Sequence, residues 1–356
     1  MGRSNRNLDF YDAKAGKKDE FYTQLTDVEL ELNHYKKHFE DKTVYLNCDD
    51  PRASSFFQYF STNFHKLGLK KLISSCYKSV DSDRFSKGLS TQSVWFEYEG
   101  KRDSSTLCAE KIDVQPFEGD GDFRSDECVA LLKQADIVVT NPPFSLFREF
   151  IAQLVEYNKK FVVLGNMNAL TYKEIFPLFQ NNQVWYGPSI RSGDREFAVP
   201  DDYPLTAAGF RVDKYGRKYI RVKGVRWFTN LEYQGRSENL LLTKKYSPTE
   251  YPKYANFGAI EVGKTADIPV DYDELMGVPI TFADKYNPNQ FDIIGSSKTL
   301  GTPMSQIAKK GTYQSGGPRF YLQDEHGTYH RMYERIVVRN KQPIRGADVN
   351  GLSISR

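Results

Sequence analysis

A tetrad of Asn141, Pro142, Pro143 and Phe144 follows an apolar run that is typical of a buried strand. Proline cannot donate to a strand ladder and keeps the preceding residue extended, so the chain should leave the sheet as a stiff hook. The Asn141 side-chain oxygen and the Pro142 carbonyl can each accept a hydrogen from an exocyclic amino group, and Phe144 offers a face for stacking. The tetrad therefore predicts a pocket for the amino group of a planar base.

Such a pocket suits transfer of a group to a poorly nucleophilic nitrogen. The lone pair of an aryl amine is delocalised into its ring, and two converging acceptors would draw the nitrogen toward tetrahedral geometry. They would also stabilise the positive charge that develops during attack. No strong base is required, which suits the neutral Asn141. An ordinary proline-rich turn after a strand is the alternative interpretation.

Two acidic turns are candidates for binding a second ligand. The first turn comprises Cys48, Asp49, Asp50 and Pro51, and small residues and a helix follow it. The second ends in Asp122 and Phe123 and precedes the strand of the tetrad. An acidic side chain can bind a sugar hydroxyl, a cationic amine or sulfonium, or an adenine amino group, and a helix N-terminus adds polar N–H groups. The alternatives are a plain helix cap at Ser54 or Ser55 and a solvated Gly-Asp loop.

The elements that position these residues alternate between helices and strands over roughly the first 240 residues. Strands are expected at 43–48, 71–76, 136–140, 161–165 and 183–187, with strand-like alternation at 93–99 in a polar, hairpin-like stretch at 80–110. Helices are expected from a capping box at 26–29, around 56–64, at 126–133 and at 146–154. This order predicts an α/β fold with a doubly wound parallel sheet. Ligands bind such sheets beyond the carboxyl ends of the strands, where Asn141 would lie.

Composition favours a soluble intracellular protein. The 356 residues are 39% hydrophobic, enough for a sizeable core in one large domain or two ordinary ones. No apolar run reaches the ~18 residues of a membrane span, and the polar N-terminus has no signal-peptide core. The four cysteines lack metal-type spacing, and His326 and His330 lack a helix pattern and an acidic partner, so no metal site is expected.

A basic stretch from Arg211 to Lys253 is the candidate surface for a nucleic acid. The net charge of the chain is only +3, so such binding must come from local patches. This stretch has 11 Lys or Arg against 4 Asp or Glu, an excess of seven, interleaved with Tyr and Trp. The C-terminal third is rich in Gly, Pro and Asn, as at 313–319, which is typical of loops that read bases. A solvated face of strands is the alternative for the basic stretch.

The order of these motifs resembles that of amino-group DNA methyltransferases, and more narrowly that of EcoRI-type adenine-specific DNA methyltransferases. The resemblance is carried by residues 18–24, 45–77, 139–150, 222–231 and 267–295. It implies a disordered tail at 1–20, a Rossmann-like methyltransferase domain at 21–240 and a loop-rich α+β target-recognition region at 241–356. It also implies S-adenosyl-L-methionine as the cofactor.

The resemblance implies a role for each matching residue. Phe21, Tyr22 and Thr23 match the segment beside the methionine part of the cofactor. Cys48, Asp49, Asp50 and Pro51 occupy the first cofactor loop, Asp122 and Phe123 match the loop at the cofactor adenine, and Asn141, Pro142, Pro143 and Phe144 match the catalytic tetrad, with Asn141 also beside the cofactor. Two departures leave individual contacts open: Ser54 and Phe56 stand where common methyltransferases have glycines, and 74–77 lack the usual acidic residue.

The expected activity is site-specific methylation of adenine N6 in double-stranded DNA, with the target base flipped out. We expect a monomer in the cytoplasm of a bacterial or phage-infected cell. A cognate restriction endonuclease would be a biological but not a physical partner. The resemblance suggests a short palindromic site such as GAATTC, although C-terminal differences could change it.

Alternatives to this activity stay open at the level of the sequence. An N-methyltransferase acting on RNA or on a protein glutamine would use the same tetrad, because the hook fits any planar amide or amine. A non-catalytic DNA-binding protein that masks sites is a second alternative. A restriction nuclease is less favoured, since Glu99-Gly100-Lys101 follows no suitably placed Pro-Asp.

Overall fold

The computed structural model describes residues 23–77, 93–100, 112–191, 194–199 and 209–344. The predicted tail at 1–20 and most of the hairpin-like stretch at 80–110 lie outside these ranges. The chain divides into two compact units, one of Met1–Ala169 with Val184–Tyr233 and the other of Leu170–Gln183 with Gln234–Arg356. Each unit is described separately below.

An eight-stranded sheet forms the centre of the first unit, in the order β4-β3-β2-β1-β5-β6-β11-β7. Its strands are β1 (Thr43–Asn47), β2 (Lys71–Cys76), β3 (Val94–Tyr98), β4 (Gln115–Pro116), β5 (Ile137–Thr140), β6 (Lys160–Asn166), β7 (Trp185–Tyr186) and β11 (Val225–Thr229). The four strands β2, β1, β5 and β6 are parallel, whereas every outer pairing is antiparallel. The mixed α/β architecture is confirmed, but the sheet is parallel only at its centre.

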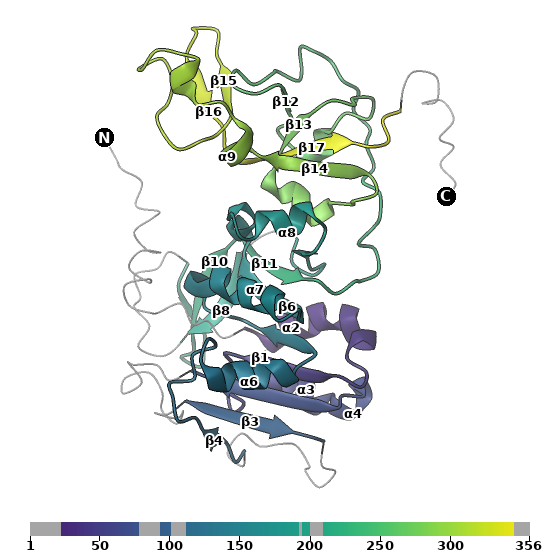
Figure 1. The fold of residues 1–356 in the computed structure, drawn as a ribbon, viewed down its shortest axis with the longest axis vertical. Helices are drawn as coiled ribbons and strands as arrows, with labels where there is room; N and C mark the ends of the chain where they lie inside the picture. Colours follow the sequence, from purple (N-terminus) through teal and green to yellow (C-terminus); the bar gives the residue numbers. More distant parts are fainter. Residues whose placement is uncertain (1–22, 78–92, 101–111, 192–193, 200–208, 345–356) are drawn as a thin grey trace. The chain divides into compact units, whose positions relative to one another are not determined.

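Helices cover both faces of this sheet (Figure 1). One face carries α2 (Leu25–Leu32), η2 (Asn33–His38), α3 (Ser55–Thr62) and α4 (Phe64–Leu67), and the other carries α6 (Asp126–Gln134) and α7 (Phe147–Glu156), which the short η4 (Phe144–Leu146) precedes. Val44 and Leu46 of β1 pack in the first layer with α2 and α3, whereas Tyr45 points to the opposite face, toward Cys128 of α6. The central strands are therefore buried on both sides, which explains why their sequences are apolar without alternation.

The predicted capping box at 26–29 is wrong. Helix α2 begins at Leu25, and its N-cap residue Gln24 makes no side-chain cap. The Gln24 side chain donates instead to the carbonyl of Glu196, 2.9 Å away, while Leu25 packs against the core. Val28, Leu32, Tyr35 and Phe39 of this segment are all fully buried.

A three-stranded antiparallel ribbon, with strand order β8-β10-β9, was not foreseen from the sequence. It consists of β8 (Asp194–Val199), β9 (Arg211–Val212) and β10 (Lys218–Lys223). Ile220 and Val222 are buried, and Arg221 and Lys223 are exposed, as the alternation of a strand with one solvated face requires. The ribbon leads through Gly224 into β11 of the main sheet.

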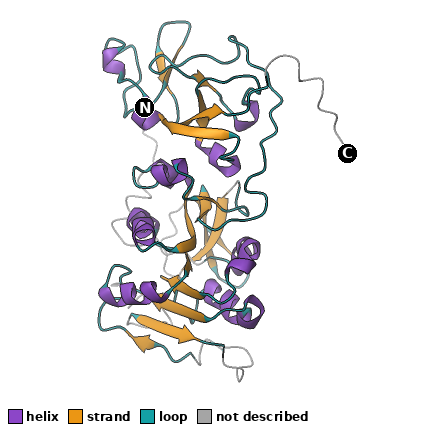
Figure 2. Cartoon of the chain, turned by 45° about the vertical axis from the view of Figure 1, so that its right-hand side comes forward, coloured by secondary structure: helices purple, strands orange, loops and turns teal. Residues whose placement is uncertain are grey.

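The second unit is built around a four-stranded sheet in the order β12-β13-β17-β14, with a separate β15–β16 hairpin. Its elements are η5 (Met167–Thr171, shared with the first unit), α8 (Phe176–Gln180), β12 (Ile260–Glu261), η6 (Thr265–Asp267), β13 (Met276–Pro279), η7 (Ile280–Lys285), β14 (Phe291–Ser296), α9 (Ser297–Leu300), η8 (Met304–Gln306), β15 (Tyr321–Gln323), β16 (Tyr329–Arg331) and β17 (Arg335–Asn340). Long loops connect them (Figure 2). Within the sheet, Glu261 and Arg335 form a buried bidentate ion pair.

Two further properties concern the described residues alone. In this part of the chain, no helix combines the length and the apolar character needed to cross a membrane. Over the same residues, no group of three or more His, Cys, Asp or Glu side chains is placed to hold a metal ion. The expectation that His326 and His330 lack an acidic partner is wrong: His330 contacts Asp324 at 2.6 Å, and His326 contacts Glu325 at 3.6 Å.

Candidate active site

Three parallel strands end in register at one edge of the first unit's sheet. Asn47 at the end of β1 pairs with Ser75 of β2, and Tyr45 pairs with Val138, which brings Asn47 level with Thr140 at the end of β5. The first acidic turn and the tetrad follow β1 and β5 directly. The register therefore places both motifs at the same edge of the sheet.

A direct side-chain contact joins the two motifs. Thr140 Oγ1 lies within hydrogen-bonding distance of Asp49 Oδ2 and of the Asn47 carbonyl. Ser54 Oγ donates to the other carboxyl oxygen of Asp49 over 2.8 Å. Sequence reasoning missed Thr140, although a polar residue that ends the apolar run 137–139 was a usable signal, and in the structure Thr140 is fully buried.

The tetrad turns away from the sheet immediately after β5. Pro143 precedes the short helix η4, and its carbonyl accepts from the Leu146 N–H over 3.0 Å. Pro142 is buried, whereas Asn141 and Phe144 are only half-buried. Phe144 is partly buried and packs against the hydrophobic core, which restricts the position of its ring.

The two acidic turns share one arrangement. Asp50 and Asp122 each form an ion pair with the arginine two residues later, over 2.5 Å to Arg52 and 2.7 Å to Arg124. Each carboxylate also accepts from the backbone N–H of that arginine, over 2.9 Å in both turns. Both carboxylates are thus fixed in orientation.

The second acidic turn lies against the end of β2. Gly121 has a φ of +74°, and a Cβ there would lie 2.9 Å from the Cys76 carbonyl. The next ring, Phe123, is buried and packs edge-on against Phe150 with ring centroids 5.2 Å apart. Gln153 Nε2 holds the Phe123 carbonyl over 3.0 Å. In this structure the Phe123 ring is therefore packed into the protein beside this edge of the sheet, and it does not present an open face for stacking.

Five residues remain that were predicted to bind the cofactor, and the structure describes three of them. Cys48 adopts a left-handed backbone with φ +77°, which is uncommon for a residue other than glycine and marks a sharp turn after β1. Pro51 and Thr23 are buried. Phe21 and Tyr22 lie outside the described residues.

A capped helix replaces the glycine-rich turn of common methyltransferases. Ser54 Oγ accepts from the backbone N–H groups of Phe56 and Phe57 over 3.1 Å and 3.2 Å, so the helix cap that was the alternative interpretation of this turn is present at Ser54. Phe56 is buried and packs edge-on against Trp227. At the end of β2, where an acidic residue is usual, Ser74 Oγ instead donates to the Asp49 carbonyl.

The carboxyl group of Asp49 has a pKa raised to about 7. Burial is the main cause of this rise, and the neighbouring carboxylate of Asp50 contributes to it, because two like charges disfavour each other. The hydrogen bonds from Thr140 and Ser54 act in the opposite direction.

The basic stretch 211–253 crosses both units, and not all of its charges face solvent. Arg226 is buried and donates to the carbonyls of Val225 and Arg191, so its role is structural. Arg221 and Lys223 are exposed on β10. The Lys223 carbonyl accepts from Asn166 at the end of β6, so Lys223 lies at the carboxyl edge of the sheet.

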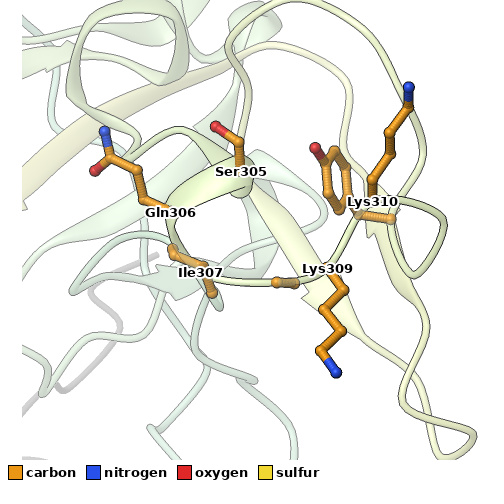
Figure 3. Close-up of a pocket in the computed structure, with 7 residues that line it drawn as sticks. Ser305, Gln306, Ile307, Lys309 and Lys310 are labelled. Atoms are coloured by element: carbon orange, nitrogen blue, oxygen red, sulfur yellow. The ribbon is translucent and has the colours of Figure 1, made fainter.

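A surface hollow in the second unit is lined by residues that belong to neither the acidic turns nor the tetrad (Figure 3). It is lined by Ser305, Gln306, Ile307, Ala308, Lys309, Lys310 and Tyr313. Its lysine side chains extend in opposite directions (Figure 3). All of the lining residues belong to the predicted target-recognition region 241–356.

Comparison with known proteins identifies a family and close relatives. The family described as "Adenine-specific methyltransferase EcoRI" matches residues 9–341. The chain is 49% identical to the type II methyltransferase M.EcoRI of Escherichia coli, over 88% of this chain and 96% of that protein. It is 40% identical to M.MgeORF184P of Mycoplasma genitalium, over 80% and 85% of the two chains. It is 36% identical to M.MpnI of Mycoplasma pneumoniae, over 94% and 99%. No solved structure matched the chain.

Proposed function

The chain belongs to the EcoRI family of adenine-specific methyltransferases, and on that premise we propose that it transfers a methyl group from S-adenosyl-L-methionine to N6 of adenine in double-stranded DNA. The relatives carry the name of type II methyltransferases. The observation that supports the residue roles is the common edge at which Asp49 contacts Thr140, the residue before Asn141. One side of this edge would hold the cofactor and the other the base.

The residues of the two acidic turns fit the cofactor. S-adenosyl-L-methionine, when bound, supplies an electrophilic methyl group on a positively charged sulfur. Asp50 and Asp122 offer acceptors in fixed orientations for its hydroxyl and amino groups. The close approach of Gly121 to the end of β2 gives the second turn a defined position. Thr23, Cys48, Pro51 and Phe123 would complete the walls, with Phe21 and Tyr22 beside the methionine part.

Asn141 and Pro142 would hold the target nitrogen. The Asn141 side-chain oxygen and the Pro142 carbonyl accept from the adenine amino group, and Phe144 stacks on the ring. Acceptance of two hydrogen bonds favours the tetrahedral, positively charged nitrogen that forms during attack, which is how this pair lowers the barrier. Asn141 is too weak a base to keep a proton, so the proton that the nitrogen loses passes to water.

The target adenine must leave the duplex to reach this pocket, at a cost of a few kcal/mol. We assign the compensating contacts to residues 241–356 as the target-recognition region and to the exposed cations of β10. Loops are frequent in the second unit, and base edges are read by side chains that project from such segments.

Replacement of Asn141 by alanine tests the assignment. Asn141→Ala should lower methyl transfer at least ~100-fold, the loss seen when one oriented hydrogen-bonding group of a transition state is removed. The dissociation constants for cofactor and DNA should stay within about threefold of the wild type, because the group acts on the reacting nitrogen. Tritiated methyl transfer and calorimetry measure the two effects. Full activity of Asn141→Ala would contradict the role of the tetrad.

The same assay distinguishes the substrate classes. Duplex DNA, RNA and a protein extract are offered in parallel with the wild-type protein, and label is expected in the DNA alone. Sequencing of modified bases in DNA from cells expressing the chain then reports the base, the atom and the recognition site. Label in RNA or in glutamine would support the rival substrate, and absence of cofactor binding would support a non-catalytic DNA-binding protein.

A further inference from the structure

Asp49 is half-buried, and both its side chain and its backbone form hydrogen bonds within the protein. Ser54 Oγ donates to Oδ1 over 2.8 Å, and Thr140 Oγ1 contacts Oδ2. Its backbone is held as well, because its N–H donates to the Ser75 carbonyl over 2.8 Å and its own carbonyl accepts from Ser74 Oγ. Asp49 is thereby fixed between the ends of β2 and β5 and the start of α3.

The hydroxyl group of Thr140 has one hydrogen and two acceptors. Its Oγ1 lies within hydrogen-bonding distance of both the Asn47 carbonyl and Asp49 Oδ2. A hydroxyl donates one hydrogen bond, so an ionised Asp49 would leave one of these oxygen pairs without a hydrogen. A proton on Asp49 Oδ2 resolves this, because Asp49 then donates to Thr140 and Thr140 donates to Asn47.

Thr140 is the residue immediately before Asn141, so the orientation of its side chain bears on the backbone from which Asn141 projects. We propose that Asp49 is a positioning residue that acts in its neutral form, donating to Thr140 and holding the strand end that carries Asn141 against the first acidic turn. This inference rests on the proposed function, in which Asn141 holds the adenine amino group. It gives Asp49 a role other than cofactor contact.

The charges around Asp49 agree with a neutral group. Burial raises the pKa of this carboxyl to about 7. The carboxylate of Asp50 on the same turn contributes to this raised pKa, and Asp50 itself is paired with Arg52. The turn and the end of β2 also carry the thiols of Cys48 and Cys76, while β5 and α3 carry no charged side chain. The second acidic turn contributes Asp120, Asp122 and Arg124, of which the last two form an ion pair.

The Asp49→Asn variant tests whether the site needs a neutral hydrogen-bond donor or a carboxylate at this position. An asparagine amide can accept from Ser54 and donate to Thr140, so the single-turnover rate of methyl transfer at pH 6 should stay within about threefold of the wild type. The wild-type rate should fall as the pH rises from 6 to 8, because Asp49 loses the proton that it donates. The Asp49→Asn rate should show no such fall. A rate lowered to the level of Asp49→Ala at every pH would overturn the proposal.

Two sets of control variants distinguish the loss of the Asp49 proton from a general structural effect of the substitution. Asp50→Asn removes a carboxylate from the same turn without touching Thr140, and its rate should keep a fall that begins at lower pH, because the Asp50 charge contributes to the raised pKa of Asp49. Thr140→Ser keeps the hydroxyl and should keep both the rate and the fall, whereas Thr140→Val should lose at least ~10-fold in rate and show no fall. If Asp49→Asn does not fold, the pH profiles of Thr140→Ser and Thr140→Val test the proposal instead. Equal pH profiles for Thr140→Ser and Thr140→Val would overturn the proposal.

Failure of the proposed function is recognised separately. A wild-type protein that methylates no adenine would disprove that function while leaving the protonation of Asp49 open to measurement. Because the folded protein keeps a proton on Asp49 that the unfolded chain releases near pH 4, the stability of the wild type relative to Asp49→Asn should fall as pH rises from about 4 to about 7. Thermal unfolding midpoints across this range measure it. Parallel midpoints for the two proteins would overturn the neutral Asp49.

Discussion

Gly121 is the single backbone position on which the second acidic turn depends. Its φ of +74° lies in the left-handed region, and an added Cβ would meet Ser93 Cβ at 2.8 Å and the Cys76 carbonyl at 2.9 Å. Strain and collision therefore act together at this residue. Any side chain larger than hydrogen would push the turn away from the end of β2.

Gly121→Ala should destabilise the first unit more than Gly216→Ala does. Gly216 has a similar φ of +82°, but a Cβ there meets nothing within 4 Å, so it reports backbone strain alone, roughly 1–2 kcal/mol. The collision at Gly121 should add ~1–3 kcal/mol. Urea unfolding of both variants measures the difference, and the Michaelis constant for the cofactor should rise only in Gly121→Ala. Equal unfolding free energies would show that the turn relaxes without cost.

At the scale of elements, helix α7 anchors the C-terminal end of the tetrad to the sheet. It follows η4 directly, and its residues Phe147, Phe150, Ile151 and Leu154 are buried against the sheet. Phe147 packs on Phe228 of β11 with ring centroids 4.8 Å apart. The helix therefore anchors one end of the Asn-Pro-Pro-Phe hook, while Thr140 anchors the other.

Leu154→Ala and Val155→Ala form a matched pair on this helix. Leu154 is fully buried, and its truncation should cost ~2–5 kcal/mol, since both transfer free energy and a cavity are involved. Val155 is 42% exposed, and its truncation should stay within about 0.5 kcal/mol. Denaturant unfolding compares them. Similar losses at the two positions would mean that α7 does not pack on the sheet as described.

The N-cap of α3 lies beside the first acidic turn and stabilises two motifs at once. Ser54 accepts from two backbone N–H groups and donates to Asp49. Ser54→Ala should therefore cost ~1–2 kcal/mol. Ser125, the N-cap of α6, accepts only from the Cys128 N–H, over 3.3 Å, and Ser125→Ala should cost less. Urea unfolding gives both values, and a larger loss at Ser125 would contradict the double role of Ser54.

At the scale of the whole molecule, net charge says little about DNA binding, because +3 is spread over 356 residues. The tertiary structure sorts the basic stretch into buried, paired and exposed cations. Arg226 is buried, Arg211 and Arg217 are paired with Glu196 and Asp213, and Arg221 and Lys223 are exposed on β10. Of these two, Lys223 lies beside the end of β6, because its carbonyl accepts from Asn166.

Combined Arg221→Ala and Lys223→Ala should weaken DNA binding and its salt dependence. Each phosphate contact contributes about 0.9 to the slope of log K against log salt, so the double variant should lose up to ~1.8. Lys36→Ala with Lys37→Ala is the control, because both residues are exposed on η2 of the same unit. Fluorescence anisotropy at several salt concentrations measures the slopes. Equal slopes for the two double variants would exclude β10 from the DNA surface.

The sequence by itself determined the family, the apolar strands and the order of the motifs. Each depends on local pattern: runs of apolar residues predict β1, β2, β5 and β6, and Pro142 and Pro143 end a strand wherever they stand. The capping box at 26–29 failed for the same reason, because a local motif cannot report that Gln24 finds its partner 172 residues away.

Only the tertiary structure decided which of these residues meet. The contact of Asp49 with Thr140 spans 91 residues, and it exists because parallel strands β1 and β5 end level with each other. The antiparallel margins of the sheet, the burial of Phe123 and the sorting of the cations are likewise consequences of pairing and packing between distant segments. Such long-range contacts set the pKa of Asp49, which neither its residue type nor its neighbours in the chain can specify.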